Sequence, residues 1–387
     1  MSICLLTVDA NCIDYYKMAY YKIPHIKIAA VASAVPTKVV KLEDFADKFG
    51  ADYVEKYKEQ TGVKQFRKTR EHQTASDLAF SAAENIINTK EINRESIGAL
   101  VFIAHSKDYW RPATACVLHK RLGLKKDCAA FDISLACSAV PYGMYALGSM
   151  METSDIDRAL LLVGETPQKI TNSDDKSSCM LIGEGGGAFL LEKTNEEGAG
   201  ISGICRSFGQ GYNAIIMPGG GFRNPNPPAE EFVWKDGNKR SMFNVMMRGE
   251  DVFAFTISDI PKTIKEYMAK EEKTVDDYDC LAIHQANKFI LQMLCKKLKV
   301  SQEKMPLCLD RYGNTSAASI PMVLGDVYGT DDSTQALNVL MSGFGVGLSW
   351  GVCSAKICPK DILPIIESDD IFEEGIINCP EDYYNLK

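Results

Sequence analysis

The sequence lacks most of the patterns that mark membrane, secreted and zinc-binding proteins. No apolar run reaches the roughly 18 residues that a membrane helix needs, and Asp9 and Asp14 stand where a signal peptide has a basic start and a longer apolar centre. The thirteen cysteines form no CxxC pair and no cluster with histidine at zinc spacing. These absences predict a cytoplasmic protein with reduced thiols, no metal and no membrane partner.

Positive charge is also scarce. The net charge is −8, and the segment 360–387 contributes −6 of it, with eight acidic residues against two lysines. No Arg-rich stretch interleaved with aromatic residues occurs, so the phosphates of a nucleic acid would meet no basic face. We therefore exclude nucleic acid as a partner and predict that the acidic tail is a solvated extension.

What the sequence does contain is a regular alternation of strand-like and helix-like segments. Runs such as ALVFIAH and RALLLVGET are typical of strands, whereas TASDLAFSAAENIINTK spaces its apolar residues as a helix does. This alternation predicts an α/β protein. Gly-rich turns lead into apolar strands at 183–193 and 343–357, which indicates two similar halves joined near 195–203. The predicted units are an N-terminal extension (1–25), a first half (26–199), a second half (200–358) and the acidic C-terminal tail (359–387).

One cysteine, Cys137, lies where a strand is predicted to turn into a helix. The run FDISLA alternates as a strand does, and CSAVPYGMYALGSMM follows as a helix whose first turn tolerates Pro141. Unpaired N–H groups and the positive end of the helix dipole would favour the thiolate of Cys137, which is the nucleophilic form. On these residues alone, a buried structural thiol remains the alternative.

Only five histidines are available as partners for such a nucleophile. His284 ends the apolar run DCLAIH and precedes the helical segment QANKFILQMLCKKL, so it would project from a strand end, where functional groups gather in α/β folds. Asn314 follows a glycine and precedes a run of small residues in RYGNTSAASIP. Taken singly, His284 can be a structural histidine and Asn314 part of a simple turn.

Two other chemistries find little support. The sequence GEGGGA precedes a strand and lacks the Lys-Ser or Lys-Thr pair of a P-loop, which argues against nucleotide binding at these glycines. The one GxSxG sequence, GLSWG at 347–351, leads into a strand-like run and not into a helix, so it lacks the nucleophile elbow of a serine hydrolase. Cys137, His284 and Asn314 therefore remain the candidate catalytic residues.

Taken together, four motifs resemble the ketosynthase III family of the thiolase superfamily, the β-ketoacyl-acyl-carrier-protein synthases that start fatty acid synthesis. They are ISLACSA around Cys137, HQAN at 284–287, GNTSAASIP at 313–321 and GFGVGLSWG at 343–351. The resemblance extends from about Ile26 to Cys358. It implies a thiolase-like, five-layered αβαβα fold of two similar halves, usually in a homodimer, with no cofactor.

The resemblance also implies a reaction. Cys137 would take an acyl group from an acyl thioester, which makes the protein an acyltransferase. His284 and Asn314 would hydrogen-bond the thioester oxygen of malonyl-acyl-carrier-protein as it loses carbon dioxide, and the carbanion would attack the acyl-cysteine. The backbone N–H groups of Cys137 and Val346 would form the oxyanion hole. Val346 replaces a glycine common in relatives, which is tolerable because only its N–H is needed.

The sequence departs from close relatives where substrates are expected to arrive. Lys56 and Gln60 replace the tryptophan and arginine that often grip coenzyme A, and Phe289 replaces an arginine that helps dock the carrier protein. The primer would thus come on a carrier protein or as an unusual acyl-CoA. An acidic carrier protein would dock on three lysines, Lys288, Lys296 and Lys297. The alternative is that these lysines only form a solvated helix face.

Other activities of the superfamily fit less well or remain open. A hydroxymethylglutaryl-CoA synthase would need a general-base glutamate near 104–109, which holds none, and a thiolase would need a second catalytic cysteine in SGFGVG. An acyltransferase that delivers the acyl group to a hydroxyl or amine would keep all three residues, so it remains open. A non-catalytic partner subunit of a ketosynthase dimer would typically lack the nucleophile, which is present here.

Overall fold

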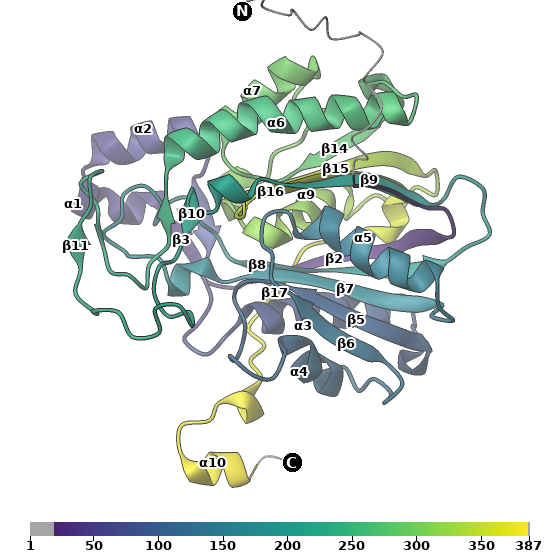
Figure 1. The fold of residues 1–387 in the computed structure, drawn as a ribbon, viewed down its shortest axis with the longest axis horizontal. Coiled ribbons are helices and arrows are strands. Elements are labelled where there is room, and N and C mark those ends of the chain that lie inside the picture. The colour runs from purple at the N-terminus through teal and green to yellow at the C-terminus, as the bar shows by residue number, and fades with distance from the viewer. Residues whose placement is uncertain (1–18, 386–387) are drawn as a thin grey trace, which may run out of the picture.

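The computed structural model describes residues 19–385 and contains two central β-sheets (Figure 1). The first sheet has the strand order β17-β2-β8-β7-β5-β6, and the second has the order β1-β9-β16-β15-β14. The strands of the first sheet are β2 (Ile26–Pro36), β5 (Ile97–Ile103), β6 (Ala129–Ile133), β7 (Arg158–Glu165), β8 (Gly185–Lys193) and β17 (Ile366–Ser368). Those of the second are β1 (Tyr20–Ile23), β9 (Ile201–Ser207), β14 (Cys280–Ile283), β15 (Leu337–Gly345) and β16 (Ser349–Ile357).

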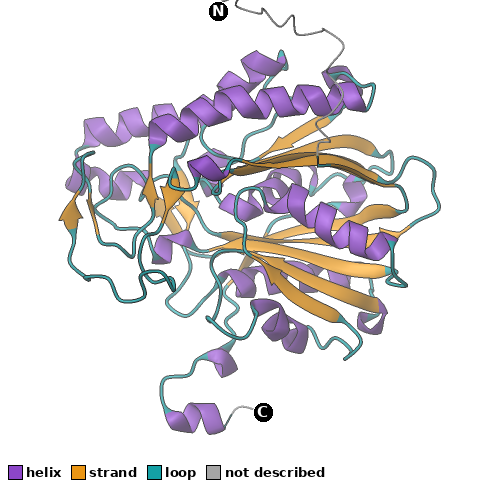
Figure 2. Cartoon of the chain, viewed as in Figure 1, coloured by secondary structure: helices purple, strands orange, loops and turns teal. Residues whose placement is uncertain are grey.

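Helices cover both outer faces of the sheets and fill the space between them (Figure 2). The layer between the sheets is formed by α5 (Ala139–Glu152) and α9 (Ser319–Tyr328), each of which contacts strands of both sheets. The outer face of the second sheet is covered by α6 (Gly249–Lys270), against which α7 (Lys288–Leu298) packs. The five layers are those of the predicted αβαβα fold.

The outer face of the first sheet is covered by α3 (Ala75–Thr89) and α4 (Thr114–Arg121). The shorter helices are α1 (Ala46–Phe49), α2 (Ala51–Thr61), α8 (Leu309–Tyr312) and α10 (Pro380–Tyr384). Three two-stranded sheets pair β3 (Val39–Lys41) with β4 (Gln65–Arg67), β10 (Ile215–Ile216) with β13 (Met246–Met247), and β11 (Phe232–Val233) with β12 (Lys239–Arg240). Within residues 19–385, no helix combines the length and the apolar character needed to cross a membrane.

The central strands read as continuous apolar runs because helices bury both faces of each sheet. In β7, for example, every residue after Arg158 is buried. In the first sheet, β2 pairs antiparallel with β8, β8 pairs antiparallel with β7, and β7 pairs parallel with β5. In the second sheet, β9, β16, β15 and β14 pair in the same order of directions. The predicted boundaries 26–199 and 200–358 stay a prediction. Strands β2, β5, β6, β7 and β8 lie in the first sheet, and β9, β14, β15 and β16 lie in the second.

The prediction of a solvated acidic tail is wrong for most of that segment. Residues Ile366–Ser368 form β17, which adds a parallel edge strand to β2. Beyond it, Asp370 pairs with Arg121, and the Tyr109 hydroxyl donates to the carbonyl of Gly375 at 2.5 Å. Five of the eight acidic residues of the tail, Asp361, Glu367, Asp369, Asp370 and Glu374, pair with basic residues of the first half. The N-terminal extension predicted for 1–25 lies mostly outside the described residues, but Tyr20–Ile23 forms the edge strand β1.

Arg121 anchors this tail, so its loss should destabilise the protein. Its guanidinium lies 2.7 Å from Asp77, and both side chains are buried. We expect Arg121→Ala to lower the free energy of unfolding by about 3–5 kcal/mol, because Asp77 would be left as an unpaired buried charge. Urea unfolding measures this. Lys120→Ala is the control, since its exposed pair with Glu374 should contribute at most about 1 kcal/mol. Equal losses in the two variants would contradict the anchoring role.

Candidate active site

Cys137 lies between the end of β6 and the start of α5, as predicted. Its side chain is half-buried, and its Sγ lies 3.4 Å from the hydroxyl oxygen of Ser316. Strand β15 passes so closely that a Cβ atom on Gly345 would stand 3.0 Å from the sulfur. Glycine at this position therefore makes room for the thiol beside the loop that carries Val346.

The prediction that the helix N-terminus favours the thiolate is wrong for this structure. Burial raises the pKa of the Cys137 thiol to about 11, and the nearby Glu165 carboxylate acts in the same direction. Hydrogen bonds from Ser316 and from the backbone N–H groups of Cys137 and Val346 lower that pKa without reversing the shift. These two N–H groups are the predicted oxyanion hole, and they meet at the sulfur.

His284 follows β14 directly and is buried at the centre of the site. Its Nδ1 lies 2.8 Å from the hydroxyl oxygen of Ser319, and its ring packs edge-on against Phe344. Burial lowers the pKa of His284 to about 4, so the imidazole is neutral at physiological pH. Because this folded-state pKa is depressed, the stability that depends on the neutral ring is present above about pH 6.5 and is lost as the pH falls toward 4.

The hydrogen bonds around Ser319 decide which nitrogen of His284 carries the proton. The Ser319 hydroxyl donates its only hydrogen to the carbonyl of Ser316, at 2.7 Å. With that assignment the same oxygen accepts from Nδ1–H of His284. It follows that Nε2 carries a lone pair and accepts, rather than donates, in this state.

Asn314 is held by both ends of its amide. Its Nδ2 donates to the carbonyl of Ala286 at 3.3 Å, and its Oδ1 accepts from the backbone N–H of Ser316 at 2.9 Å. One hydrogen of Nδ2 is left for a substrate oxygen. The structure thus ties Asn314 to the turn that follows His284, which the sequence could not show.

Ser316 is the residue of this site that sequence reasoning missed. It contacts Cys137 through its hydroxyl, Asn314 through its N–H and, by way of Ser319, His284 through its carbonyl. Its φ of 51° lies in the left-handed region, which is uncommon for a residue with a side chain. The only signal in the sequence was the run of small residues after Asn314.

Removing the Ser316 hydroxyl should make Cys137 less reactive. Because that hydroxyl lowers the thiol pKa, Ser316→Ala is expected to raise it and to slow alkylation of Cys137 by iodoacetamide several-fold at pH 9, the size of one ordinary hydrogen bond. The measurement is the alkylation rate against pH, followed by peptide mass. Ser134→Ala, at an exposed position of the same segment, is the control. An unchanged pH profile would show that Ser316 does not act on the thiol.

The other residues of the predicted motifs have structural roles or lie apart. Asn287 caps α7 by accepting from the N–H of Ile290, and Gln285 is buried with its amide bound to backbone groups. Lys288 begins α7 and packs on Gly62, whereas the other two predicted docking residues, Lys296 and Lys297, lie exposed in its last turn. The structure therefore does not gather the three lysines into one cluster.

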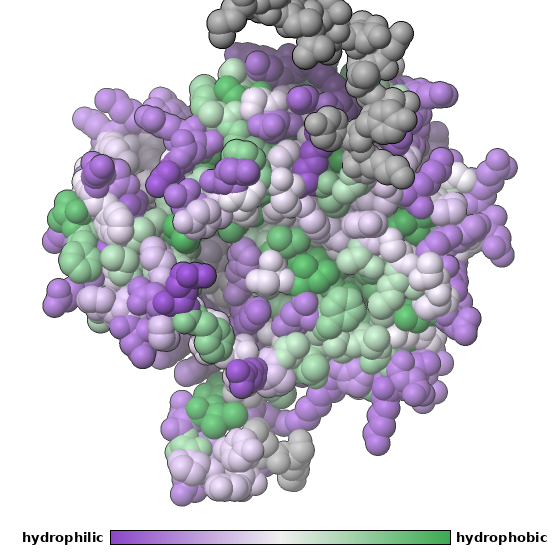
Figure 3. Space-filling model, viewed as in Figure 1, coloured by the Kyte–Doolittle hydropathy of each residue, from purple (hydrophilic) through white to green (hydrophobic). Residues whose placement is uncertain are grey.

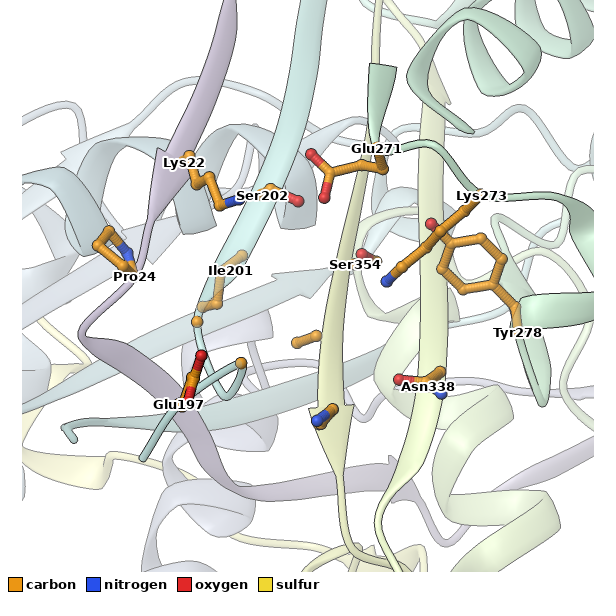
Figure 4. Close-up of a pocket in the computed structure, with 14 residues that line it drawn as sticks. Lys22, Pro24, Glu197, Ile201, Ser202, Glu271, Lys273, Tyr278, Asn338 and Ser354 are labelled. Carbon is orange, nitrogen blue, oxygen red and sulfur yellow. The ribbon is translucent and has the colours of Figure 1, made fainter. Parts of the chain in front are cut away.

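Two cavities differ sharply in their relation to these residues. A cavity of about 570 Å³ is lined by Val346 and Glu165, so it adjoins the thiol. Another, of about 370 Å³, lies across the second sheet near Lys22, Glu271 and Lys273 (Figure 4). Its lining residues include none of the candidate catalytic ones. Of the two, only the first adjoins the loop that carries Val346.

Comparisons with known proteins agree with this arrangement. Residues 268–357 match the family "3-Oxoacyl-[acyl-carrier-protein (ACP)] synthase III C terminal", and residues 131–207 match "3-Oxoacyl-[acyl-carrier-protein (ACP)] synthase III". The chain is 33% identical to the β-ketoacyl-[acyl-carrier-protein] synthase III of Desulfitobacterium hafniense (strain Y51), over 86% of this chain and 97% of that protein. For the Clostridioides difficile (strain 630) protein of the same name, identity is also 33%, over 76% and 88%.

A solved structure gives the same result. The crystal structure of a 3-oxoacyl-(acyl-carrier protein) synthase from Burkholderia xenovorans LB400 superposes with a TM-score of 0.85 at 32% identity, covering 91% of this chain and 99% of that one. The fold is therefore the thiolase-like fold that the motifs implied. From its sequence, its fold and its relatives, the chain belongs to the β-ketoacyl-acyl-carrier-protein synthase III family.

Proposed function

We propose that Cys137 carries an acyl group, which this condensing enzyme joins to a malonyl group held by an acyl carrier protein. The observation that carries the proposal is the convergence on one sulfur of two backbone N–H groups and Ser316, which in turn holds Asn314 and, through Ser319, His284. Such a reaction requires a nucleophile and an oxyanion hole for the acyl oxygen. It also requires two side chains that donate to the malonyl thioester oxygen when that oxygen becomes negatively charged. The comparisons do not favour the alternatives of an acyltransferase without condensation or a silent subunit.

The first step is transfer of the acyl group to the thiol. The Cys137 thiol loses its proton to the lone pair on Nε2 of His284 as the sulfur attacks the acyl carbonyl. The new carbon–sulfur bond replaces the old one, and the donor leaves as a thiolate that takes up the proton from His284. The N–H groups of Cys137 and Val346 stabilise the oxyanion during the attack.

The second step begins with a neutral His284, because a ring whose pKa is about 4 does not keep the proton of the first step. Its single ring proton then stands on Nε2, and Nδ1 accepts from the Ser319 hydroxyl. As malonyl-carrier loses carbon dioxide, the electron pair moves to its thioester oxygen, where Nε2–H of His284 and the free Nδ2 hydrogen of Asn314 donate to it. The carbanion then attacks the acyl-cysteine, and the Cys137 thiolate leaves and takes a proton from solvent. One proton from solvent is consumed per turnover, so the cycle balances.

Delivery of malonyl-carrier is expected near the N-terminal ends of α6 and α7. There, Phe253 and Phe289 stack with ring centroids 5.6 Å apart, and Phe289 is exposed. Lys288 lies beside this pair, in a hollow whose lining mixes the basic residues Lys58, Lys64 and Arg311 with the acidic residues Glu55, Glu59 and Asp310. We propose that the carrier docks on Lys288 and this aromatic pair. Lys296 and Lys297 would contribute only to long-range attraction, because they lie more than two helical turns farther along α7.

Dimerisation and cellular location belong to the same proposal. Strand β6 is the edge of the first sheet, and Phe131 on it and Tyr145 on α5 are exposed. Apolar side chains gather on this face of the molecule over α5 (Figure 3). An open edge beside exposed aromatic groups supports a homodimer. The eleven cysteines within residues 19–385 are free thiols, which supports action in the cytoplasm, in fatty acid biosynthesis.

The direct test supplies both substrates in turn. The protein is incubated with a panel of acyl-CoAs and acyl-carrier proteins, and intact mass shows which acyl group it retains. Malonyl-carrier is then added, and the expected product is a 3-oxoacyl-carrier two carbons longer than the retained acyl group. Retention of an acyl group without this product would favour simple acyl transfer over condensation.

A further inference from the structure

A buried carboxylate that the proposed mechanism does not use stands at the end of β7. Glu165 is 4% exposed. It accepts hydrogen bonds from the backbone N–H of His105, at 2.7 Å, and from the hydroxyl of Ser106. The segment 104–109 contains no glutamate of its own, but the fold brings this one to it from 60 residues away.

Glu165 shares a cavity with the oxyanion hole. The cavity of about 570 Å³ is lined by Glu165 and by Val346, whose N–H points to the Cys137 sulfur. The effect of the Glu165 charge on the Cys137 pKa also places the two groups in one neighbourhood. An acyl chain that extends from Cys137 past Val346 would therefore enter a cavity that this carboxylate lines.

The rest of the cavity is divided into an apolar wall and a basic rim. Ile215, Ile216 and Met217 form much of the wall, and they belong to a long connection that runs up to α6. A buried ion pair between Arg240 and Asp175, at 2.6 Å, fixes this connection to the first half. The exposed rim carries Lys107 and Lys169. The wall suits an aliphatic chain, which leaves Glu165 as its one buried charged neighbour.

Glu165 has hydrogen-bonding capacity that the protein leaves unused. A carboxylate can accept about four hydrogen bonds, and the structure gives Glu165 three, from the N–H of His105 and from the N–H and hydroxyl of Ser106. A plain alkyl chain would displace water from the remaining acceptor capacity without donating a hydrogen bond in its place, which is unfavourable. A site built in this way discriminates against a ligand that lacks the matching polar group. The basic rim makes an ammonium group a poor match, so a hydroxyl is favoured.

We propose that Glu165 is a specificity-determining residue and that the primer is a hydroxylated acyl group whose hydroxyl, near the thioester carbonyl, donates to this carboxylate. The inference rests on the proposed function of Cys137. It adds the chemical class of the acyl group.

The test compares primers of equal length. Butyryl, 2-hydroxybutyryl and 3-hydroxybutyryl groups are offered on coenzyme A and on a carrier protein, and the acylation rate of Cys137 is followed by intact mass. The wild type is expected to prefer a hydroxylated primer by about tenfold or more. Glu165→Leu should reverse the preference. Glu165→Gln should retain part of it, because an amide oxygen still accepts and the contacts to His105 and Ser106 can persist.

The outcomes separate specificity from a structural role and from the proposed function. If Glu165 only holds the 105–106 turn, Glu165→Leu will lower the melting temperature and slow all primers equally, and the unchanged ratio overturns the inference. A wild type that reacts equally with butyryl and hydroxybutyryl groups overturns it too. If Cys137 is alkylated by iodoacetamide but takes up no acyl group from any donor, the proposed function itself fails, and the inference fails with it.

Discussion

A Cys137→Ala variant is expected to show no acyl adduct by intact mass and to lose condensation by a factor on the order of 10⁴ or more. The acyl group must be bound covalently while the carbanion forms, and the alanine side chain of the variant has no nucleophilic atom. The oxyanion hole would keep its backbone N–H groups, so the loss reports the nucleophile alone. The measurement is the rate of 3-oxoacyl-carrier formation together with the mass of the protein after incubation with acyl donors.

Another cysteine provides the control for this prediction. Cys116 is an exposed free thiol on α4, so Cys116→Ala should leave both the adduct and the rate unchanged. The expected pair of results assigns acylation to one thiol among those of the described part of the chain. An acyl adduct that forms equally well in Cys137→Ala would rule out the covalent mechanism.

His284→Ala is expected to separate the two steps by their dependence on pH. Without a proton acceptor, acylation of Cys137 should be slow near pH 7 but recover toward pH 10, because the thiol then ionises on its own. Decarboxylation of malonyl-carrier should fall by about 10²–10³-fold at every pH, since the donor to the thioester oxygen is gone. Acylation is followed by intact mass and decarboxylation by the release of carbon dioxide.

Asn314→Ala is the matched comparison, because in the proposed mechanism Asn314 meets only the malonyl thioester. It should lose decarboxylation to a similar degree while acylating normally at pH 7. If His284→Ala decarboxylated malonyl-carrier at the wild-type rate, the assignment of the buried imidazole would be wrong, whatever happened to acylation.

The sequence predicted those parts of the site that depend on local pattern. Cys137 at a strand-to-helix turn and His284 at a strand end could be recognised because strand and helix periodicities differ over a few residues. Both positions are as predicted. The pKa of Cys137 was predicted in the wrong direction, because a helix N-terminus can be read from sequence whereas the depth of burial cannot.

Features formed by distant segments were not predicted. Ser316 joins three elements, and Glu165 lies against a segment that contains no acid. No spacing or composition links these positions, since only the packing of the first sheet against its neighbours brings them together. The acidic tail was misread for the same reason, because its partner Arg121 lies 249 residues away in the sequence.

The edge strands β1 and β17 tie the two halves of the protein together. The strand β1 precedes the first half but extends the sheet of the second, and β17 follows the second half but extends the sheet of the first. The sheet of each half therefore has an edge strand that comes from the opposite end of the chain. Severing the connection near residue 197 would give two pieces that each lack their own border strand and carry the other's. The two halves are consequently not separable modules.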